Sequence, residues 1–197
     1  MIYLFTGTPG SGKSLHASSI LINRLNRKLT DRRVIANFEI NEKYNRKGSF
    51  TYCSNENLEP RFFIEYSKNN LVFGKENQCL IFIDECQILF NSRDWQACKN
   101  RMDWIKFFTQ HRKLGYDIYL ITQQDRMLDR QIRNLAEYHV IHRKCNNFKF
   151  FRFIPQSVFV AITYWYGCNE RINSEFFTYR KKLGDLYNSY KMFDNAL

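Results

Sequence analysis

Short apolar runs alternate along the chain with longer stretches in which apolar residues recur every three or four positions. The first run, residues 1–6, predicts a strand, and the helical spacing over 13–29 predicts the helix that follows it. Further runs of both kinds predict strands at 34–38, 50–52, 79–83, 117–122 and 138–143, and helices at 60–67, 100–114 and 129–135.

This alternation of strands and helices is typical of the α/β class, with a mainly parallel sheet flanked by helices. The run at 79–83 supports the class, because a continuous apolar run fits a strand buried on both faces of a parallel sheet. After residue 144 two aromatic-rich segments, 148–154 and 158–166, predict a β extension of the sheet, and 174–197 has the pattern of a polar, basic tail. We therefore expect a core over 1–145 and, within the same domain, a β extension and basic tail over 146–197.

The composition indicates a globular protein but does not identify its partner. The 197 residues are 44% hydrophobic and 25% charged, which fits one globular unit with a sizeable core and excludes a disordered or fibrous chain. A net charge of +11 favours partners that carry phosphates or other acidic groups.

The longest apolar run, 158–167, is about half the length that a membrane-spanning helix needs, and we expect a chain that is neither secreted nor membrane-spanning. Six cysteines without a C-x-x-C pair predict reduced thiols rather than zinc or disulfides.

Residues 7–14 match the pattern G-x-x-x-x-G-K-[ST], directly after a predicted strand and before a predicted helix. In such a phosphate loop the glycines let backbone N–H groups turn inward toward phosphate oxygens, above the positive end of the helix. Lys13 is expected to reach the β- and γ-phosphates of ATP, and the Ser14 hydroxyl to coordinate Mg²⁺. The candidate nucleotide-binding residues are Gly7, Thr8, Pro9, Gly10, Ser11, Gly12, Lys13, Ser14 and Leu15.

Asp84 and Glu85 follow the apolar run 79–83, at the end of a strand where ligands bind in open α/β sheets. Asp84 is expected to hold Mg²⁺, through a water molecule, and Glu85 to polarise the water that attacks the γ-phosphate. The alternative is an acidic pair that caps the next helix.

Gln123 follows the strand predicted at 117–122 and is a candidate for contact with the γ-phosphate or the attacking water, with Gln124 as an ordinary surface amide beside it. Arginines on either side of that strand include candidates for a finger that one subunit inserts into the site of the next. A solvated basic face is the alternative for each of them, and the basic, aromatic stretch 144–153 also fits contacts with nucleic acid. The candidate trans arginines are Arg112, Arg130 and Arg133.

Taken together, several segments resemble the Zot (zonular occludens toxin-like) family, which includes an assembly protein of filamentous phages. The resemblance covers residues 1–145, and weakly 186–193. The segments that carry it are Ile2–Ser14, Asp84-Glu85-Cys86-Gln87, the run from Thr109 to Ile118 that contains His-Arg-Lys-Leu-Gly-Tyr-Asp-Ile, the strand end Ile121-Thr122-Gln123, and Leu128–Leu135.

The resemblance implies a P-loop ATPase of the FtsK/HerA translocase branch that powers assembly and export of single-stranded DNA phage. It implies a ring of identical subunits, with phage single-stranded DNA or coat and assembly proteins as partners. It also implies a location in the bacterial host cytoplasm, at the inner face of the inner membrane. Family members usually continue into a transmembrane helix, which this sequence lacks, so membrane association would need further segments or partners.

Two alternatives stay open from the residues alone. One is a small nucleoside or metabolite kinase, in which 125–133 would form an arginine-rich lid over the phosphates. The other is a nucleotide-gated DNA-binding scaffold with negligible turnover.

Overall fold

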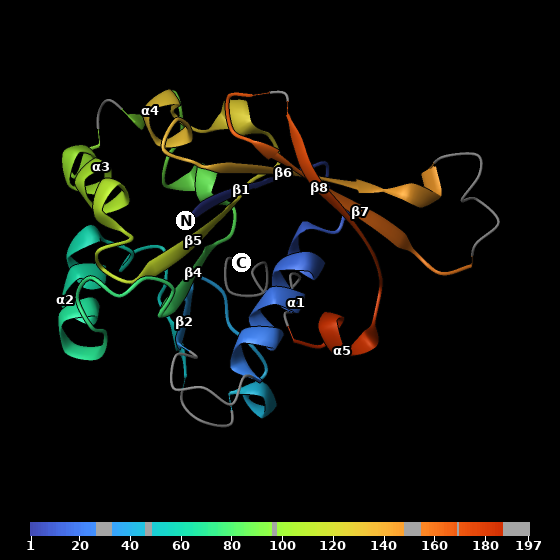
Figure 1. Cartoon of the computed structure of the whole chain (residues 1–197), viewed down its shortest axis with the longest axis horizontal. Helices are drawn as coiled ribbons and strands as arrows, with labels where there is room; N and C mark the ends of the chain where they lie inside the picture. The colour runs from blue at the N-terminus through green and yellow to red at the C-terminus, as the bar shows by residue number, and fades with distance from the viewer. Residues whose placement is uncertain (27–32, 46–48, 96–97, 148–154, 169, 187–197) are drawn as a thin grey trace, which may run out of the picture.

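The computed structural model describes residues 1–26, 33–45, 49–95, 98–147, 155–168 and 170–186. Eight strands form one sheet in the order β3-β2-β4-β5-β1-β6-β7-β8 (Figure 1). The first six strands in this order are parallel, and β7 and β8 continue the sheet in antiparallel pairing. The strands are β1 (Ile2–Thr6), β2 (Arg33–Ala36), β3 (Phe50–Tyr52), β4 (Cys79–Ile83), β5 (Tyr116–Ile121), β6 (Tyr138–Lys144), β7 (Val158–Trp165) and β8 (Arg171–Thr178).

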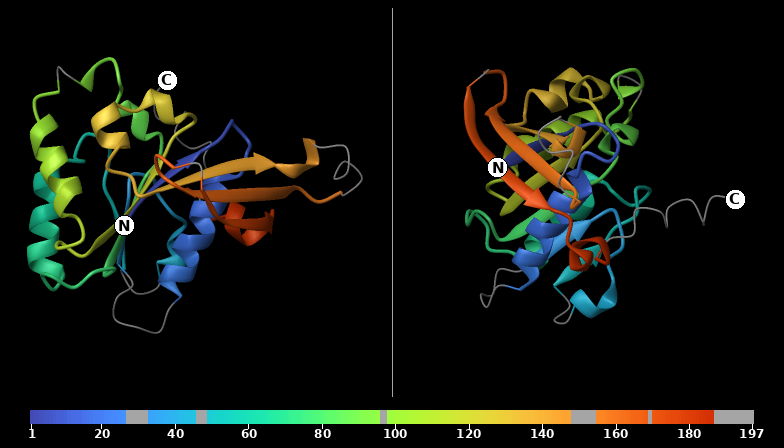
Figure 2. Two further views of the ribbon diagram at one scale, coloured as in Figure 1. Left: turned by 45° about the horizontal axis from the view of Figure 1, so that its top comes forward. Right: turned by 90° about the vertical axis from the view of Figure 1, so that its right-hand side faces the viewer.

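Helices cover both faces of the sheet, as Figures 1 and 2 show. On one face α1 (Lys13–Leu25) packs Leu21 against the sheet, and the short α5 (Lys181–Gly184) lies beside it. On the other face α2 (Pro60–Asn70), α3 (Arg101–Gln110) and α4 (Arg130–Arg133) contribute a second core rich in aromatic rings. The result is a three-layer α/β structure in which β4 and β5 are buried along their whole length.

A ladder of aromatic rings crosses five strands on the α1 face of the sheet. Phe82 stacks on Tyr119 with ring centroids 4.6 Å apart, and Tyr119 stacks on Tyr3 at 4.8 Å. Tyr3 stacks on Tyr138 at 5.0 Å, and Tyr138 lies 4.9 Å from Trp165 on β7. Such cross-strand ring pairs each stabilise a sheet by up to about 1 kcal/mol beyond area burial. The ladder therefore ties the antiparallel extension to the parallel core.

The predicted α/β class with a mainly parallel sheet and a C-terminal β extension is confirmed. The expectation that 174–197 is a tail from its first residue is wrong, because 174–178 belongs to β8, which pairs with β7. β8 lies at the edge of the sheet and is mostly exposed, so its sequence lacks the apolar alternation of a half-buried strand. The strand predicted at 148–154 lies outside the described residues.

The structure also bears on the cysteines, on metal sites and on membrane-spanning helices. All six cysteines are free thiols. Within the described ranges no group of three or more His, Cys, Asp or Glu side chains is arranged to hold a metal ion. None of the helices described is both long and apolar enough to span a bilayer.

Candidate active site

The phosphate loop leaves β1 at the centre of the sheet, between β5 and β6. Because all three strands are parallel, their carboxyl ends meet at the same edge, where open α/β sheets bind ligands. The Gly7 N–H donates to the Gln123 carbonyl at 3.1 Å, which fixes the start of the loop to the end of β5. The Ser11 N–H then donates to the Thr8 carbonyl at 3.1 Å, and this turn leads the chain into α1.

Glycines give the loop a backbone shape that side chains disfavour. Gly10 has φ 72° and Gly12, the residue before α1, has φ 95°, both in the left-handed region. No side chain caps the amino end of α1, and its first turn carries no acidic residue. The first N–H groups of the helix are therefore available to an anion, with the positive end of the helix dipole behind them.

Lys13 lies over the loop that precedes it. Its ammonium donates to the carbonyls of Gly7 and Thr8, at 2.6 Å and 3.2 Å. Burial lowers the pKa of Lys13, whereas the negative charges of Asp84 and Glu85 act in the opposite direction. The lysine thus lies within electrostatic reach of both acidic residues that follow β4.

Asp84 is held at the end of β4 by a residue from the neighbouring strand. The side-chain amide of Asn37, which follows β2, donates to the Asp84 carbonyl at 2.8 Å, and its oxygen accepts from the Asp84 N–H at 2.7 Å. The Asp84 carboxylate accepts from the Glu85 N–H at 2.9 Å. These bonds fix the backbone of the acidic pair relative to β2 and β4.

Glu85 has an unusual backbone conformation and an anchored side chain. Its φ of 49° and ψ of 41° place it in the left-handed region, which costs a residue with a Cβ about 1–2 kcal/mol. Gln87 donates from its side-chain amide to the Glu85 carboxylate. Such strain is typical of functional sites, where the surrounding structure holds a side chain in a set direction.

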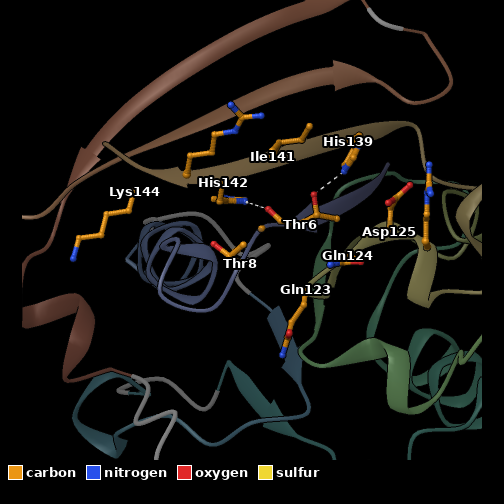
Figure 3. Close-up of a pocket in the computed structure, with 12 residues that line it drawn as sticks. Thr6, Thr8, Gln123, Gln124, Asp125, His139, Ile141, His142 and Lys144 are labelled. Carbon is orange, nitrogen blue, oxygen red and sulfur yellow. Dashed lines mark hydrogen bonds between the residues drawn. The ribbon is translucent and has the colours of Figure 1, made fainter. Parts of the chain in front are cut away.

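Gln123 follows β5, the strand that lies between β1 with its phosphate loop and β4 with its acidic pair. β4 and β5 pair in parallel, so Gln123 and Asp84 follow neighbouring strands at the same end of the sheet. Gln123 and Gln124 are both exposed and both line a cavity of about 600 Å³ beside the loop. In Figure 3 the Gln123 side chain points away from Thr6, and Asp125 lies on the opposite side of the cavity from Lys144.

The three candidate trans arginines lie in different surroundings. Arg112 is ion-paired with Glu137 at the amino ends of β5 and β6, whereas the phosphate loop lies at the carboxyl ends of these strands. Arg133 is half-buried and lies 3.6 Å from Asp125. Arg130 is exposed at the start of α4. The sheet therefore keeps Arg112 away from the site of its own chain.

Sequence reasoning missed Asn37, Gln87 and the histidines of the cavity. Asn37 lies inside the strand predicted at 34–38, and only the end of β2 at Ala36 places its amide at the carboxyl end of the parallel strands. Gln87 lies two residues from Glu85, within reach of a side-chain hydrogen bond. His139 and His142 carried no signal, because their positions depend on β6 pairing with β1.

The residues fit a nucleotide with a divalent cation. The Ser11 hydroxyl is buried inside the loop and, among the atoms described, has no hydrogen-bond partner. A hydroxyl from Ser14 and a carboxylate from Asp84 are the oxygen ligands that Mg²⁺ prefers, and Mg²⁺ keeps several waters besides. The donor set therefore suits a magnesium ion held between the loop and the end of β4.

Comparison with known proteins gives one family. A family model described as zonular occludens toxin (Zot) matches residues 1–190. The Gene 1 protein of Enterobacteria phage I2-2 is 29% identical over 149 residues, covering 72% of this chain and 39% of its own length. That of Escherichia phage If1 is 29% identical over 147 residues, covering 72% and 40%. The chain thus spans about two fifths of the length of these relatives.

Solved structures share the fold. The N-terminal domain of zonular occludens toxin from Neisseria meningitidis superposes with a TM-score of 0.61 at 23% identity, covering 95% of this chain and 98% of that one. The genome packaging NTPase B204 from Sulfolobus turreted icosahedral virus 2, in complex with ATP-gammaS, gives 0.54 at 17% identity, covering 89% and 95%. The fold is that of P-loop ATPases.

Proposed function

The chain belongs to the zonular occludens toxin (Zot) family, and from this premise we propose that it is a Mg²⁺-dependent ATPase that powers assembly or export of filamentous phage, or movement of phage DNA. The observation that carries the proposal is the order of the strands. The phosphate loop after β1 and the acidic pair after β4 lie on either side of β5, which brings Gln123 to the same edge. One edge of the sheet therefore holds groups for binding phosphates, for holding a metal and for activating water.

Each residue has a role that follows from its position. The backbone N–H groups of the loop and of the first turn of α1 bind the phosphate chain, and Lys13 moves from the Gly7 carbonyl to the β- and γ-phosphates. Ser14 and Asp84 hold Mg²⁺, which neutralises charge on the β- and γ-phosphate oxygens when it is bound.

Hydrolysis needs a group that orients and activates water, and on this proposal Glu85 supplies it. Its carboxylate is held by Gln87, while Asp84 beside it is committed to the metal. The Glu85 carboxylate accepts a proton from the attacking water, and Gln123 donates a hydrogen bond to the γ-phosphate or to that water. ATP is converted to ADP and phosphate.

Phage relatives and the shared fold with a genome packaging NTPase support a role in phage morphogenesis. On this proposal copies of the chain assemble into a ring, and phage single-stranded DNA or coat and assembly proteins are the partners. The net charge of +11 suits a phosphate-bearing partner. The proposed location is the host cytoplasm at the inner face of the inner membrane.

The test measures phosphate release from Mg-ATP by the wild type and by Glu85→Gln, together with binding of a fluorescent ATP analogue. We expect turnover to fall on the order of a hundredfold in the variant while the analogue still binds. The exposed Glu65 on α2 offers a matched control, and Glu65→Gln should leave turnover unchanged. Unchanged turnover in Glu85→Gln would remove Glu85 from the role of base, and phosphorylation of an acceptor instead of phosphate release would make the protein a kinase.

A further inference from the structure

Three of the four histidines in the chain gather around Thr6, the last residue of β1 before the phosphate loop. Thr6 is held from both faces of the sheet by neighbours on β6. The Thr6 hydroxyl lies 2.7 Å from His139 Nε2, and the Thr6 carbonyl lies 3.2 Å from His142 Nδ1 (Figure 3). The third, His16, is in the first turn of α1, directly after the loop.

The hydrogen bonds fix which nitrogen of each ring carries a proton. A carbonyl only accepts, so His142 Nδ1 donates to Thr6 and, in the neutral ring, His142 Nε2 accepts. His16 Nδ1 lies 2.9 Å from His142 Nε2 and is therefore the donor. Burial keeps both rings neutral, lowering the pKa of His142 to about 3 and that of His16 to about 4.

The chain of hydrogen bonds ends at His16, whose ring contacts residues of the antiparallel extension. His16 Nε2 lies 3.8 Å from a carboxylate oxygen of Glu175 on β8, too far for a hydrogen bond, so the contact with β8 is made by the rings. The His16 ring stacks on Phe5 of β1 with centroids 5.1 Å apart, and its centroid lies 5.2 Å from that of Phe177, also on β8. The first turn of α1 is therefore held between β1 and β8.

The loop itself lies against the same layer of side chains. A Cβ on Gly12 would lie 2.8 Å from the Phe159 ring of β7, and a Cβ on Gly7 would lie 2.6 Å from the His142 carbonyl oxygen. Phe159 is buried and stacks on Phe177 at 5.5 Å. Both ends of the phosphate loop are thus in close contact with residues outside the nucleotide pattern.

We propose that His16, His142, Phe159 and Phe177, here called the bracing cluster, are positioning residues for the phosphate loop. On this view the β7–β8 hairpin belongs to the nucleotide site through its contacts with the phosphate loop and with His16. Backbone donors bind phosphates well only when supporting residues hold them within about 0.5 Å of the productive geometry. The inference rests on the proposed function, because it concerns the same loop and the same nucleotide.

Two pairs of variants test the cluster by equilibrium binding of a fluorescent ATP analogue. His16→Leu removes the donor to His142 but keeps apolar volume, whereas His16→Asn retains an N–H near the position of Nδ1. Phe159→Ala opens space beneath Gly12, and Phe159→Leu fills most of it. We expect the Leu variant at 16 and the Ala variant at 159 each to weaken binding about tenfold, and their conservative partners to weaken it less than about threefold.

A merely structural cluster would give a different result. Melting temperatures would then fall in all four variants, and binding at a temperature where each is folded would equal that of the wild type. That outcome overturns the proposal. Phe62→Ala, which truncates a partly buried ring on α2 in the other core, serves as the matched control and should not change binding. If His16→Leu does not fold, the Phe159 pair decides.

The readout separates this inference from the proposed function. A wild type that binds the analogue without hydrolysing ATP contradicts the proposed ATPase but leaves the comparison of binding constants intact. Full turnover in the wild type together with normal binding in His16→Leu and Phe159→Ala contradicts the bracing cluster alone.

Discussion

The side-chain amide of Gln87 donates a hydrogen bond to the carboxylate of Glu85, two residues before it. Glu85 is one of two non-glycine residues with positive φ within the described ranges, and the hydrogen bond holds its side chain in a single direction. The oxygen of the same Gln87 amide is buried, with no hydrogen-bond partner among the described residues. Gln87 is thus positioned by its contact with the carboxylate and by packing, rather than by a wider polar network.

Gln87→Ala should therefore lower kcat for ATP about tenfold and leave KM nearly unchanged, because the carboxylate that we propose to activate water loses its orientation while the phosphate loop is intact. Steady-state phosphate release over a range of ATP concentrations measures both constants. Gln87→Glu places a like charge against Glu85 and should lower kcat further. A rise in KM with constant kcat would show that Gln87 acts on nucleotide binding instead.

Lys13→Ala should reduce turnover on the order of a hundredfold or more, since it removes the cation expected at the β- and γ-phosphates. The melting temperature should change little, because the Lys13 ammonium donates its hydrogen bonds to the carbonyls of Gly7 and Thr8, on a loop at the surface. Thermal unfolding and phosphate release are measured on the same sample. Lys43 is exposed and lies outside the phosphate loop, so Lys43→Ala is the control and should keep full turnover.

The two glycines of the loop with φ near 70–95° make a matched pair. Alanine at Gly10 meets no atom within 4 Å and suffers only the left-handed backbone, about 1–2 kcal/mol. Alanine at Gly12 suffers the same strain and also collides with Phe159 at 2.8 Å. Gly12→Ala should therefore weaken nucleotide binding more than Gly10→Ala does.

Combining Gly12→Ala with Phe159→Ala relieves the collision, so the two substitutions should be less than additive in a double-mutant cycle of binding free energies. Additive effects would mean that the ring and the glycine act independently.

The buried His142 should make folding sensitive to mildly acidic pH. Burial first, and then the neighbouring His16, lower its pKa to about 3, against about 6.5 in the unfolded chain. Below pH ~6.5 the unfolded state therefore binds the proton and the folded state does not. The free energy of unfolding should fall as the pH falls, by about 1.4 kcal/mol per unit from this residue, and be fully retained above pH ~6.5.

Urea unfolding from about pH 7 to about pH 5 measures this slope. His142→Gln removes the titrating ring, so the variant should be less stable at neutral pH but show a shallower decline. An identical slope in both proteins would assign the acid sensitivity to other groups.

If a neighbouring copy of the chain supplies an arginine finger, ATPase activity should rise steeply with protein concentration. Arg112→Ala, Arg130→Ala and Arg133→Ala can each be mixed with Glu85→Gln, which keeps its own arginines but lacks the proposed base. For the variant that lacks the finger, mixing should restore turnover, because Glu85→Gln subunits supply arginines to intact sites. Turnover proportional to enzyme, from a monomer, would contradict the ring.

The candidate site could be predicted from the sequence as far as its residues are neighbours in the chain. The loop at 7–14 and the pair at 84–85 are each a single run of residues that follows an apolar strand. Local sequence was therefore enough to predict a role for each and to place both at the carboxyl ends of the strands. β8 could not be predicted in the same way. Its residues are mostly exposed at the edge of the sheet, and an exposed strand needs no alternation of apolar and polar positions.

The sequence by itself determined the α/β class, the phosphate loop and the acidic pair, because local spacing dictates them. Only the tertiary structure decided what surrounds them. Arg112 lies at the amino ends of the strands, away from the phosphate loop, because it precedes β5. Asn37 reaches Asp84 because β2 pairs with β4. His16 meets His142 across 126 residues of chain because β6 lies beside β1. Contacts of this kind depend on the order of strands in the sheet, which no local pattern of apolar and polar residues specifies.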